Sequence, residues 1–445
     1  MHVLIFGPCP GGRYSYGKVA KYLGAGLAAR GFRVSYACGS ERYEISLGGG
    51  RRADVYPSAT LQIGNTVNAS TLTYYANKLR PDFIIAIGGP WDPGMKFELM
   101  GFATARLSSQ ELRKVRLVGH FTFDWFAAPE DSVKQPFLYV HVAAMPTEAE
   151  RRYACIPRDR FVKVPHGVNR EIFNPDVRPE PIQLPFKPDI VVGSVMKNHG
   201  RKNWAAAAFV AAALNVWGFR AAFLPFTTYA AGTQNWWSFD DVFKGAAQFF
   251  PSSFGNATLL AYLPTTPGGP PQLQEVDLPV LRPTTSVELA HGYDEDEQAR
   301  VMKLMDLHVL PTRGEGFSLA VLESLALGIP NIVTDVEVLR ELYGRYRSVV
   351  FVRPATYFVW PSEGTFFYEV DMDELAHRAI DVAEHLEEYK ERAARDAERA
   401  LREYTWERAV EAMERALDLS TRFDTTMYED AVDVLSGGGR RWQLP

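Results

Sequence analysis

Residues 316–334 read Gly-Phe-Ser-Leu-Ala-Val-Leu-Glu-Ser-Leu-Ala-Leu-Gly-Ile-Pro-Asn-Ile-Val-Thr, and they predict an apolar helix followed by a strand over 331–334. A helix that is apolar on every side is a buried helix. Glu323 is the only charged residue of this stretch. Because a buried carboxylate costs several kcal/mol unless a partner or a ligand meets it, Glu323 indicates either a binding site or an unusual core.

A second carboxylate, Glu315, precedes this helix in the turn Pro-Thr-Arg-Gly-Glu-Gly. The flanking Gly314 and Gly316 allow close backbone approach, and the first amides of a helix point out of its N-terminus. We therefore expect an anion site there, formed by the amides of Gly316, Phe317, Ser318 and Leu319. Glu315 can accept hydrogen bonds from sugar hydroxyls; alternatively, it only complements the helix dipole.

Strand and helix patterns alternate on both sides of this stretch. The predicted strands lie at 2–6, 32–37, 83–87, 115–118, 139–143, 189–195, 221–226, 307–311 and 331–334. Helical patterns between them, as at 15–30 and 203–217, predict an α/β chain with doubly wound parallel sheets. The pattern stops at a Pro-rich linker near 175–185, so two such domains are expected. We expect an irregular excursion over 264–285 and exposed amphipathic helices over 372–419.

The composition describes an ordinary soluble globular protein. The chain has 445 residues, 47% hydrophobic and 23% charged, which predicts two or three domains. A net charge of -5 argues against nucleic acid as the main partner. Cys9, Cys38 and Cys155 are few and odd in number, so neither a disulfide framework nor a zinc knuckle is indicated. A reducing cytosol fits best, and the N-terminus reads as a strand rather than a signal peptide.

A basic turn follows the predicted strand 189–195 and opens the next helix. It contains Lys197, Arg201 and Lys202 within the run Lys-Asn-His-Gly-Arg-Lys. Fixed positive charge at a strand-to-helix turn suits a phosphate, since the helix N-terminus adds amides and a positive dipole end. The alternative is a solvated basic turn.

The loop after the first strand is a further candidate. Gly7, Gly11 and Gly12 do not have the spacing of a dinucleotide fingerprint, so an NAD site is not expected. The loop still lies at the carboxyl end of a strand, where doubly wound sheets bind ligands, and we expect Gly12 to contact the donor described below.

Other polar residues allow two interpretations each. His120 and Asp124 follow the strand over 115–118 and either face a ligand or serve the structure. His166 is interpreted as a turn residue. Asp294-Glu-Asp296 spells a metal-binding pattern, but it begins a helix, so capping is the better account.

Together these motifs resemble family 4 of the glycosyltransferases, which have the GT-B fold. The run from Glu315 to Glu323 resembles the family's E-x7-E motif, and Lys197 to Lys202 resembles its donor-diphosphate pair. Pro-His-Gly-Val-Asn, ending at Asn169, resembles the signature that ends the first domain. The resemblance covers nearly the whole chain.

The resemblance implies two Rossmann-like, doubly wound domains that face a cleft. These would be an acceptor domain over 1–178, a donor domain over 179–403, and C-terminal helices and a tail over 404–445. Glu323 would bind the ribose and Glu315 the donor sugar, while Lys197 and Lys202 would neutralise the leaving diphosphate, with Arg201 beside them. His120 or Asp124 would serve the acceptor.

The implied activity is retaining sugar transfer from a nucleotide-diphosphate sugar, without a metal or another cofactor. The acceptor is a glycan, a lipid-linked molecule or a small molecule. Alternatives are a non-catalytic nucleotide-sugar-binding scaffold and a sugar epimerase or phosphorylase of the same fold. The expected location is cytoplasmic. Arg51-Arg52 and Arg113-Lys114 could bring the first domain to the inner face of an anionic membrane, although such pairs are more often a solvated face.

Overall fold

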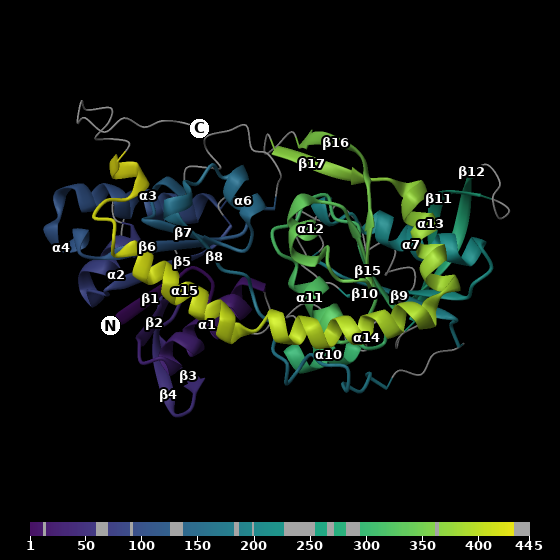
Figure 1. Cartoon of the computed structure of the whole chain (residues 1–445), viewed down its shortest axis with the longest axis horizontal. Helices are drawn as coiled ribbons and strands as arrows, with labels where there is room; N and C mark the ends of the chain where they lie inside the picture. The colour runs from purple at the N-terminus through teal and green to yellow at the C-terminus, as the bar shows by residue number, and fades with distance from the viewer. Residues whose placement is uncertain are drawn as a thin grey trace. The chain divides into compact units, whose positions relative to one another are not determined.

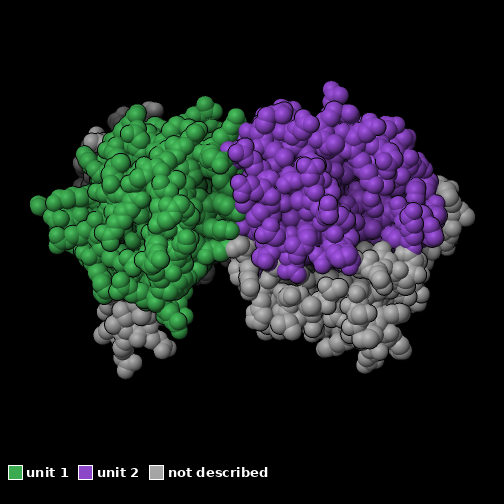
Figure 2. All heavy atoms as spheres, turned by 90° about the horizontal axis from the view of Figure 1, so that it is seen from below, with its two compact units in different colours: residues 1–167, 362–365, 406–445 green, residues 168–361, 366–405 purple. Residues whose placement is uncertain are grey.

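The structure is a computed structural model of the whole chain. It describes residues 1–11, 15–58, 70–89, 92–124, 137–181, 187–197, 200–226, 254–264, 271–281, 294–360 and 365–430. The chain divides into two compact units (Figures 1 and 2). Unit 1 contains Met1–Gly167 and the chain from Trp406, and unit 2 contains most of the chain between them.

Unit 1 is built on an eight-stranded sheet. Its strands are β1 (His2–Phe6), β2 (Arg33–Ala37), β3 (Tyr43–Gly48), β4 (Arg51–Tyr56), β5 (Phe83–Gly88), β6 (Arg116–Phe121), β7 (Val142–Met145) and β8 (Phe161–Lys163). Their order is β3-β4-β2-β1-β5-β6-β7-β8, and β3 is antiparallel to β4. The helices are α1 (Ser15–Ala29), α2 (Thr71–Leu79), α3 (Pro93–Ser108), α4 (Gln110–Arg113), α6 (Glu148–Tyr153) and α15 (Trp406–Ser420), with a 3-10 turn η1 (Arg158–Arg160).

The core of unit 1 joins its two chain segments. Val410 and Met413 of α15 belong to the same apolar cluster as Leu23 and Leu27 of α1. The two helices approach closely at Gly26, where an added Cβ would lie 2.3 Å from Cγ2 of Val410. Helix α15 is thus part of the core of unit 1, although it follows unit 2 in the sequence (Figure 1).

Unit 2 repeats the design with a seven-stranded sheet. Its strands are β9 (Ile190–Val195), β10 (Ala221–Phe226), β11 (Phe254–Pro264), β12 (Pro271–Leu281), β13 (Leu307–Leu310), β14 (Asn331–Thr334) and β15 (Val349–Val352). The order is β11-β12-β10-β9-β13-β14-β15. The helices are η2 (Gly200–Lys202), α7 (Trp204–Val216), α10 (Glu295–Met302), α11 (Leu319–Ala326), α12 (Glu337–Tyr343), α13 (Met372–Glu384) and α14 (Leu386–Glu403). A separate hairpin pairs β16 (Pro354–Trp360) with β17 (Thr365–Val370).

Both sheets contain a point where the strand order reverses. In unit 2, the order runs outward from β9 to β10 and β12 on one side, and to β13, β14 and β15 on the other. The corresponding pair in unit 1 is β1 and β5. Ligands of doubly wound sheets bind at the carboxyl ends of the strands at this switch point. In unit 2, the loops after β9 and β13 are therefore the place to look.

The structure corrects two predictions. The excursion predicted as irregular over 264–285 is wrong for 271–281, because β11 and β12 form an antiparallel hairpin with Phe254 opposite Leu281. The view that the cysteines indicate no disulfide is also wrong, since Cys9 and Cys38 are bonded. Cys9 follows β1 and Cys38 follows β2, and these adjacent parallel strands end at the same edge, with Phe6 opposite Ala37. Cys155 is free and exposed.

Within the part of the chain that the structure describes, no helix has both the length and the apolar character needed to cross a membrane.

Candidate functional site

The basic turn after β9 is fixed by its own backbone and by α7. Gly200–Lys202 form the 3-10 turn η2, and Asn203 follows with a φ of 55°, in the left-handed region. The indole of Trp204 donates to the carbonyl of Lys197 at 3.2 Å. Lys202 is almost completely buried, whereas Lys197 is exposed. The turn thus has one cation in the protein interior, Lys202, and one in contact with solvent, Lys197.

The turn after β13 is bonded directly to this basic turn. The amide of Arg313 donates to the carbonyl of Arg201 at 2.7 Å, and the guanidinium of Arg201 donates to the carbonyl of Gly314 at 2.9 Å. The hydroxyl of Thr312 also donates to the carbonyl of Gly314, at 2.7 Å. The two loops at the switch point therefore form one connected structure.

This connection places Glu315 against the basic residues. Lys202 Nζ donates to Glu315 Oε2, and Arg201 Nη1 lies 3.5 Å from the same oxygen. Burial opposes the charge of Glu315, but Lys202 and Arg201 outweigh it and lower the pKa of the carboxyl below its ordinary value. At neutral pH the group of three therefore carries one net positive charge, and it can attract an anion.

Helix α11 begins at Leu319, four residues after Glu315. Ser318 is the N-cap, with a φ of 62°, and its side chain makes no capping hydrogen bond. The hydroxyl of Tyr343 donates to the carbonyls of Phe317 and Ser318, at 3.0 and 3.1 Å. These bonds hold a backbone conformation that L-residues rarely adopt. The first amides of α11, which begins at Leu319, have no acceptor within the helix and are available to an anion.

Glu323 lies in the middle of α11 and is 3% exposed. Its Oε2 accepts a hydrogen bond of 2.5 Å from Nε2 of Gln298, which comes from α10. A buried carboxylate is costly without such a partner, and Gln298 supplies one. Gln298 was not predicted; the available signal was a polar residue on the buried face of an amphipathic helix.

A second group of unpredicted residues braces the two loops from the β16–β17 hairpin. Glu369 of β17 accepts from Arg313 Nε at 2.7 Å and from Asn203 Nδ2 at 2.9 Å. Arg313 also donates to the carbonyl of Gly200 at 2.7 Å, and the amide of Tyr368 donates to the carbonyl of Arg313 at 2.8 Å. Nothing local in the sequence links Glu369 to Arg313, because the two residues are 56 positions apart.

In unit 1, His120 lies at the end of β6 and is almost completely buried. Its Nδ1 is 2.9 Å from the carbonyl of Ala144, so Nδ1 carries the proton. Its Nε2 therefore accepts, and His166 Nε2, 3.2 Å away, donates to it. Burial lowers the pKa of His120 to about 4, and it also lowers the pKa of His166 well below its ordinary value. His166, expected as a turn residue, is thus a buried partner of His120.

Asp124 follows β6 and is also buried. Nearby Glu150 caps α6: its carboxylate accepts from the amide of Phe123 at 2.7 Å and from the Thr147 hydroxyl at 2.9 Å. Burial is the main cause that raises the pKa of Glu150 well above its ordinary value, and the charge of Asp124 adds to it. Roles for His120 and Asp124 toward an acceptor stay predictions.

Two further predictions concern Gly12 and Asp294. Gly12 lies outside the described residues. Asp294 caps α10, with its carboxylate accepting from the amide of Glu297 at 2.8 Å, so the capping interpretation is confirmed.

Residues 282–413 match the model of a family described as "Family 4 Glycosyltransferase in conflict systems". The resemblance to the family 4 glycosyltransferases is confirmed. A stretch of 48 residues is 44% identical to the O-antigen biosynthesis glycosyltransferase WclY of Escherichia coli. That stretch covers 11% of this chain and only 14% of the WclY length.

Solved structures show the GT-B fold over almost the whole chain. Sucrose-phosphate synthase from Thermosynechococcus elongatus is similar with a TM-score of 0.65 at 14% identity, over 93% of this chain and 97% of that one. Trehalose 6-phosphate synthase from Burkholderia multivorans has a TM-score of 0.59 at 12% identity, over 94% and 98%. Anabaena HepE in complex with UDP-glucose has 0.58 at 11%, over 95% and 100%. The prediction of the GT-B fold is therefore confirmed.

Proposed function

We propose that this family 4 relative is a retaining glycosyltransferase that moves a sugar from a nucleotide-diphosphate sugar to a hydroxyl acceptor. The observation that carries the proposal is the meeting of Lys202, Arg201 and Glu315 at the switch point of unit 2. A solvated basic turn would expose its cations, whereas Lys202 is 8% exposed. Taking Lys202 and Glu315 out of water is costly even as a pair, and a function in binding an anionic donor would account for that cost.

The proposed chemistry is stabilisation of a leaving diphosphate. The bond from the anomeric carbon to the diphosphate oxygen breaks, the acceptor oxygen bonds to that carbon, and the acceptor proton leaves with the diphosphate. Charge develops on the diphosphate, so cations and amides held in place before the reaction lower the barrier. Lys202 and Arg201 supply the cations, with Lys197 at the exposed end of the turn, and the amides from Gly316 to Leu319 supply the dipoles.

Glu323 is proposed to bind the ribose, and Glu315 the donor sugar. A ribose hydroxyl would donate to the Glu323 carboxylate, of which Oε2 already accepts from Gln298. Glu315 remains ionised, because Lys202 and Arg201 lower its pKa. It can therefore accept from sugar hydroxyls at neutral pH. No metal or other cofactor enters this proposal.

The ligands bound in similar solved structures support a nucleotide-sugar donor. HepE has been solved with UDP-glucose, and starch synthase IV from Arabidopsis thaliana with ADP and acarbose, the latter at a TM-score of 0.60 and 10% identity. These ligands belong to those proteins. They motivate a panel of UDP-, ADP- and GDP-sugars as donors for this chain.

The test is release of nucleoside diphosphate from that panel by wild type, Lys202→Met and Glu323→Gln. We expect both variants to lose at least about 100-fold in turnover, the size of effect seen when one preorganised donor is removed. Arg220→Met is the matched control, because Arg220 forms an exposed ion pair with Asp189 in the same unit. Near wild-type turnover in both site variants would reject the proposal.

The same panel separates the alternatives. A non-catalytic scaffold would bind a nucleotide-sugar, as seen in a thermal shift, without hydrolysing or transferring it. An epimerase or phosphorylase would convert a sugar without a hydroxyl acceptor. Retention is tested separately, by the anomeric configuration of the product in NMR spectra.

A further inference from the structure

The neighbouring helices α2 and α3 of unit 1 carry a concentration of exposed apolar side chains. The described residues include eight large hydrophobic side chains that are exposed, and half of them lie on α2 and α3. Tyr74 is on α2, and Phe97, Met100 and Leu107 are on α3, with exposures of 39–43%. Scattered apolar residues are normal on a surface, so it is the clustering that needs a cause.

The three residues of α3 form a stripe. At 100° per residue, Phe97, Met100 and Leu107 fall within an arc of about 80° on one side of the helix. Leu99 and Phe102 are buried on the opposite side. The outer side of the helix is therefore largely apolar, and the one polar residue inside the arc, Thr104, donates its hydroxyl to the carbonyl of Met100 at 2.8 Å. A solvated surface helix does not require such an outer side.

The helices α2 and α3 present this surface as one rigid element. The carboxylate of Glu98, on α3, accepts from the Ser70 hydroxyl at 2.6 Å and from the Leu72 amide at 2.8 Å, at the N-terminus of α2. These bonds also bury Glu98, which removes a negative charge from the exposed face.

Basic residues border the stripe. Arg113 of α4 donates to the carbonyls of Arg106 and Leu107, at 3.0 and 2.6 Å, which holds a cation beside the end of the stripe. Lys78 donates to the Tyr74 hydroxyl at 3.2 Å. The helices α2, α3 and α4 with their capping residues carry more basic than acidic side chains, apart from the buried Glu98 and Arg106. The basic residues are Lys78, Arg80, Lys96, Arg113 and Lys114, and the acidic ones are Asp92 and Glu111. This basic excess stands on a chain whose net charge is -5.

We propose that this α2–α3 face, made of Tyr74, Phe97, Met100 and Leu107 with their basic border, docks on an anionic lipid surface. Apolar side chains would enter the headgroup boundary while the cations contact lipid phosphates, as in interfacial amphipathic helices. A second copy of the chain is disfavoured, because pairing this face with itself would bring two basic borders together. The inference is independent of the proposed transferase activity.

The test is flotation of the full chain with vesicles. Wild type should float with equal parts of phosphatidylcholine and phosphatidylglycerol, should not float with phosphatidylcholine alone, and should be released by added salt, which screens the lipid charge. The triple variant Phe97→Ser, Met100→Ser, Leu107→Ser should lose flotation. Tyr357→Ser with Val359→Ser is the matched control, because it removes two exposed apolar side chains from β16.

A charge variant guards against misfolding of the apolar variant. Lys78→Glu with Lys114→Glu alters only exposed side chains and should weaken binding at least about 20-fold, taking about fivefold for each charge near the surface. Wild type that stays unbound to anionic vesicles would overturn the proposal, as would equal binding by all variants. A concentration-dependent dimer that the triple variant abolishes would also overturn the proposal, and the face would then bind a second copy of the chain. Binding of an acidic protein without binding of lipid would overturn it in favour of a protein partner.

Discussion

Lys202 and Glu315 form a buried ion pair that joins the two loops at the switch point of the unit 2 sheet. Their side chains are 11% and 8% exposed. The two loops are also joined directly, because the Arg313 amide donates to the Arg201 carbonyl and the Arg201 guanidinium donates to the Gly314 carbonyl. Charges that protein contacts fix in this way need little rearrangement, which is what preorganised charge stabilisation requires.

The first prediction concerns the stability of this pair. Lys202→Met should lower the free energy of unfolding by about 2–3 kcal/mol, since it leaves Glu315 buried with only Arg201 nearby. Lys202→Met with Glu315→Gln should recover part of the loss, because no unpaired charge remains. Urea unfolding at neutral pH measures both, with Arg220→Met as an exposed control that should change by less than about 1 kcal/mol. A double variant less stable than the single one by the full sum would contradict the coupling.

Local sequence patterns were sufficient to predict the α/β architecture and the two separate elements that carry Lys202 and Glu323. The alternation of apolar strands and helices predicts most of the parallel strands, because a strand buried on both faces leaves a continuous apolar run. It misses β4, β12 and β15, which also pair in parallel, and it places β7 only in part. The apolar helix around Glu323 and the basic turn at Lys202 were visible for the same reason: charge at an unexpected position. Only the family resemblance implied that Lys202 and Glu315 serve the same donor, and their direct ion pair was not predicted.

What the sequence could not reveal are partners that the topology brings together. Gln298 and Glu323 come from different helices, and Glu369 reaches Arg313 from a hairpin that was not predicted. Cys9 and Cys38 were misjudged because counting cysteines ignores the edge where β1 and β2 both end. Periodicity describes the face on which a residue lies, and it carries no information on which distant residue lies opposite.

The second prediction concerns Glu369. Glu369→Ala should reduce donor turnover by about 10-fold, because a small displacement of a positioned loop weakens catalysis. Faster amide hydrogen exchange over 200–203 should accompany the loss, which a change elsewhere in the hairpin would not produce. Glu369→Gln should restore part of the activity by accepting from Arg313. Tyr357→Ser, on the exposed side of β16, is the control; equal exchange in wild type and Glu369→Ala would refute the brace.

The third prediction follows from the pKa of His120. Its value of about 4 in the folded chain lies below the ordinary 6.5, because the ring is buried. As pH falls through about 6.5, the unfolded chain takes up a proton that folded His120 does not, so this residue lowers stability by up to about 1.4 kcal/mol per pH unit down to about pH 4. In NMR titrations, the His120 ring should stay neutral at pH 5. Exposed His385, whose pKa is raised mainly by the carbonyl of Asp381, should be protonated there. If the His120 ring took up its proton over the same pH range as His385, it would not be the buried neutral ring described above.

The fourth prediction concerns the bond between Cys9 and Cys38. Thiol counting in denaturant without reductant should find one thiol, from Cys155, rather than three. The bond closes a loop with a sequence separation of 29, so Cys9→Ser with Cys38→Ser should lower the free energy of unfolding by about 3–4 kcal/mol on the chain-entropy account. Cys155→Ser is the control and should leave stability unchanged. Three reactive thiols in protein purified without reductant would contradict the pairing.

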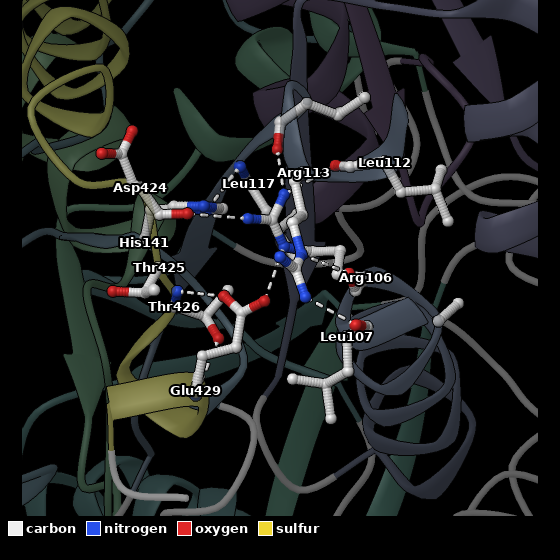
Figure 3. A network of polar contacts seen from close by, with 12 residues as sticks. Arg106, Leu107, Leu112, Arg113, Leu117, His141, Asp424, Thr425, Thr426 and Glu429 are labelled. Atoms are coloured by element: carbon white, nitrogen blue, oxygen red, sulfur yellow. Dashed lines mark hydrogen bonds and ion pairs between the residues drawn. The ribbon is translucent and has the colours of Figure 1, made fainter. Parts of the chain in front are cut away.

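The last prediction concerns the segment after α15, which unit 1 holds with a buried arginine (Figure 3). Arg106 is fully buried; it donates to the carbonyls of Leu112 and Val115 at 2.7 Å and of Asp424 at 3.1 Å, and it pairs with Glu429 at 3.4 Å. Arg106→Met leaves buried carbonyls and the Glu429 carboxylate without this donor, so we expect a loss of about 3–5 kcal/mol in urea unfolding.

The same segment contains a matched control for the contacts of Arg106. Arg116 pairs with the carboxylate of Asp424 at 3.1 Å, but the Asp424 side chain is 97% exposed. Asp424→Asn should therefore change stability by less than about 1 kcal/mol, even though it removes an ion pair from the same contact. Trypsin should cleave near Arg422 faster in Arg106→Met than in wild type or Asp424→Asn. The reason is that the variant lacks the contacts of Arg106 with Asp424 and Glu429, which hold the segment against the rest of unit 1. Equal cleavage rates in all three proteins would show that burial of Arg106 does not restrain it.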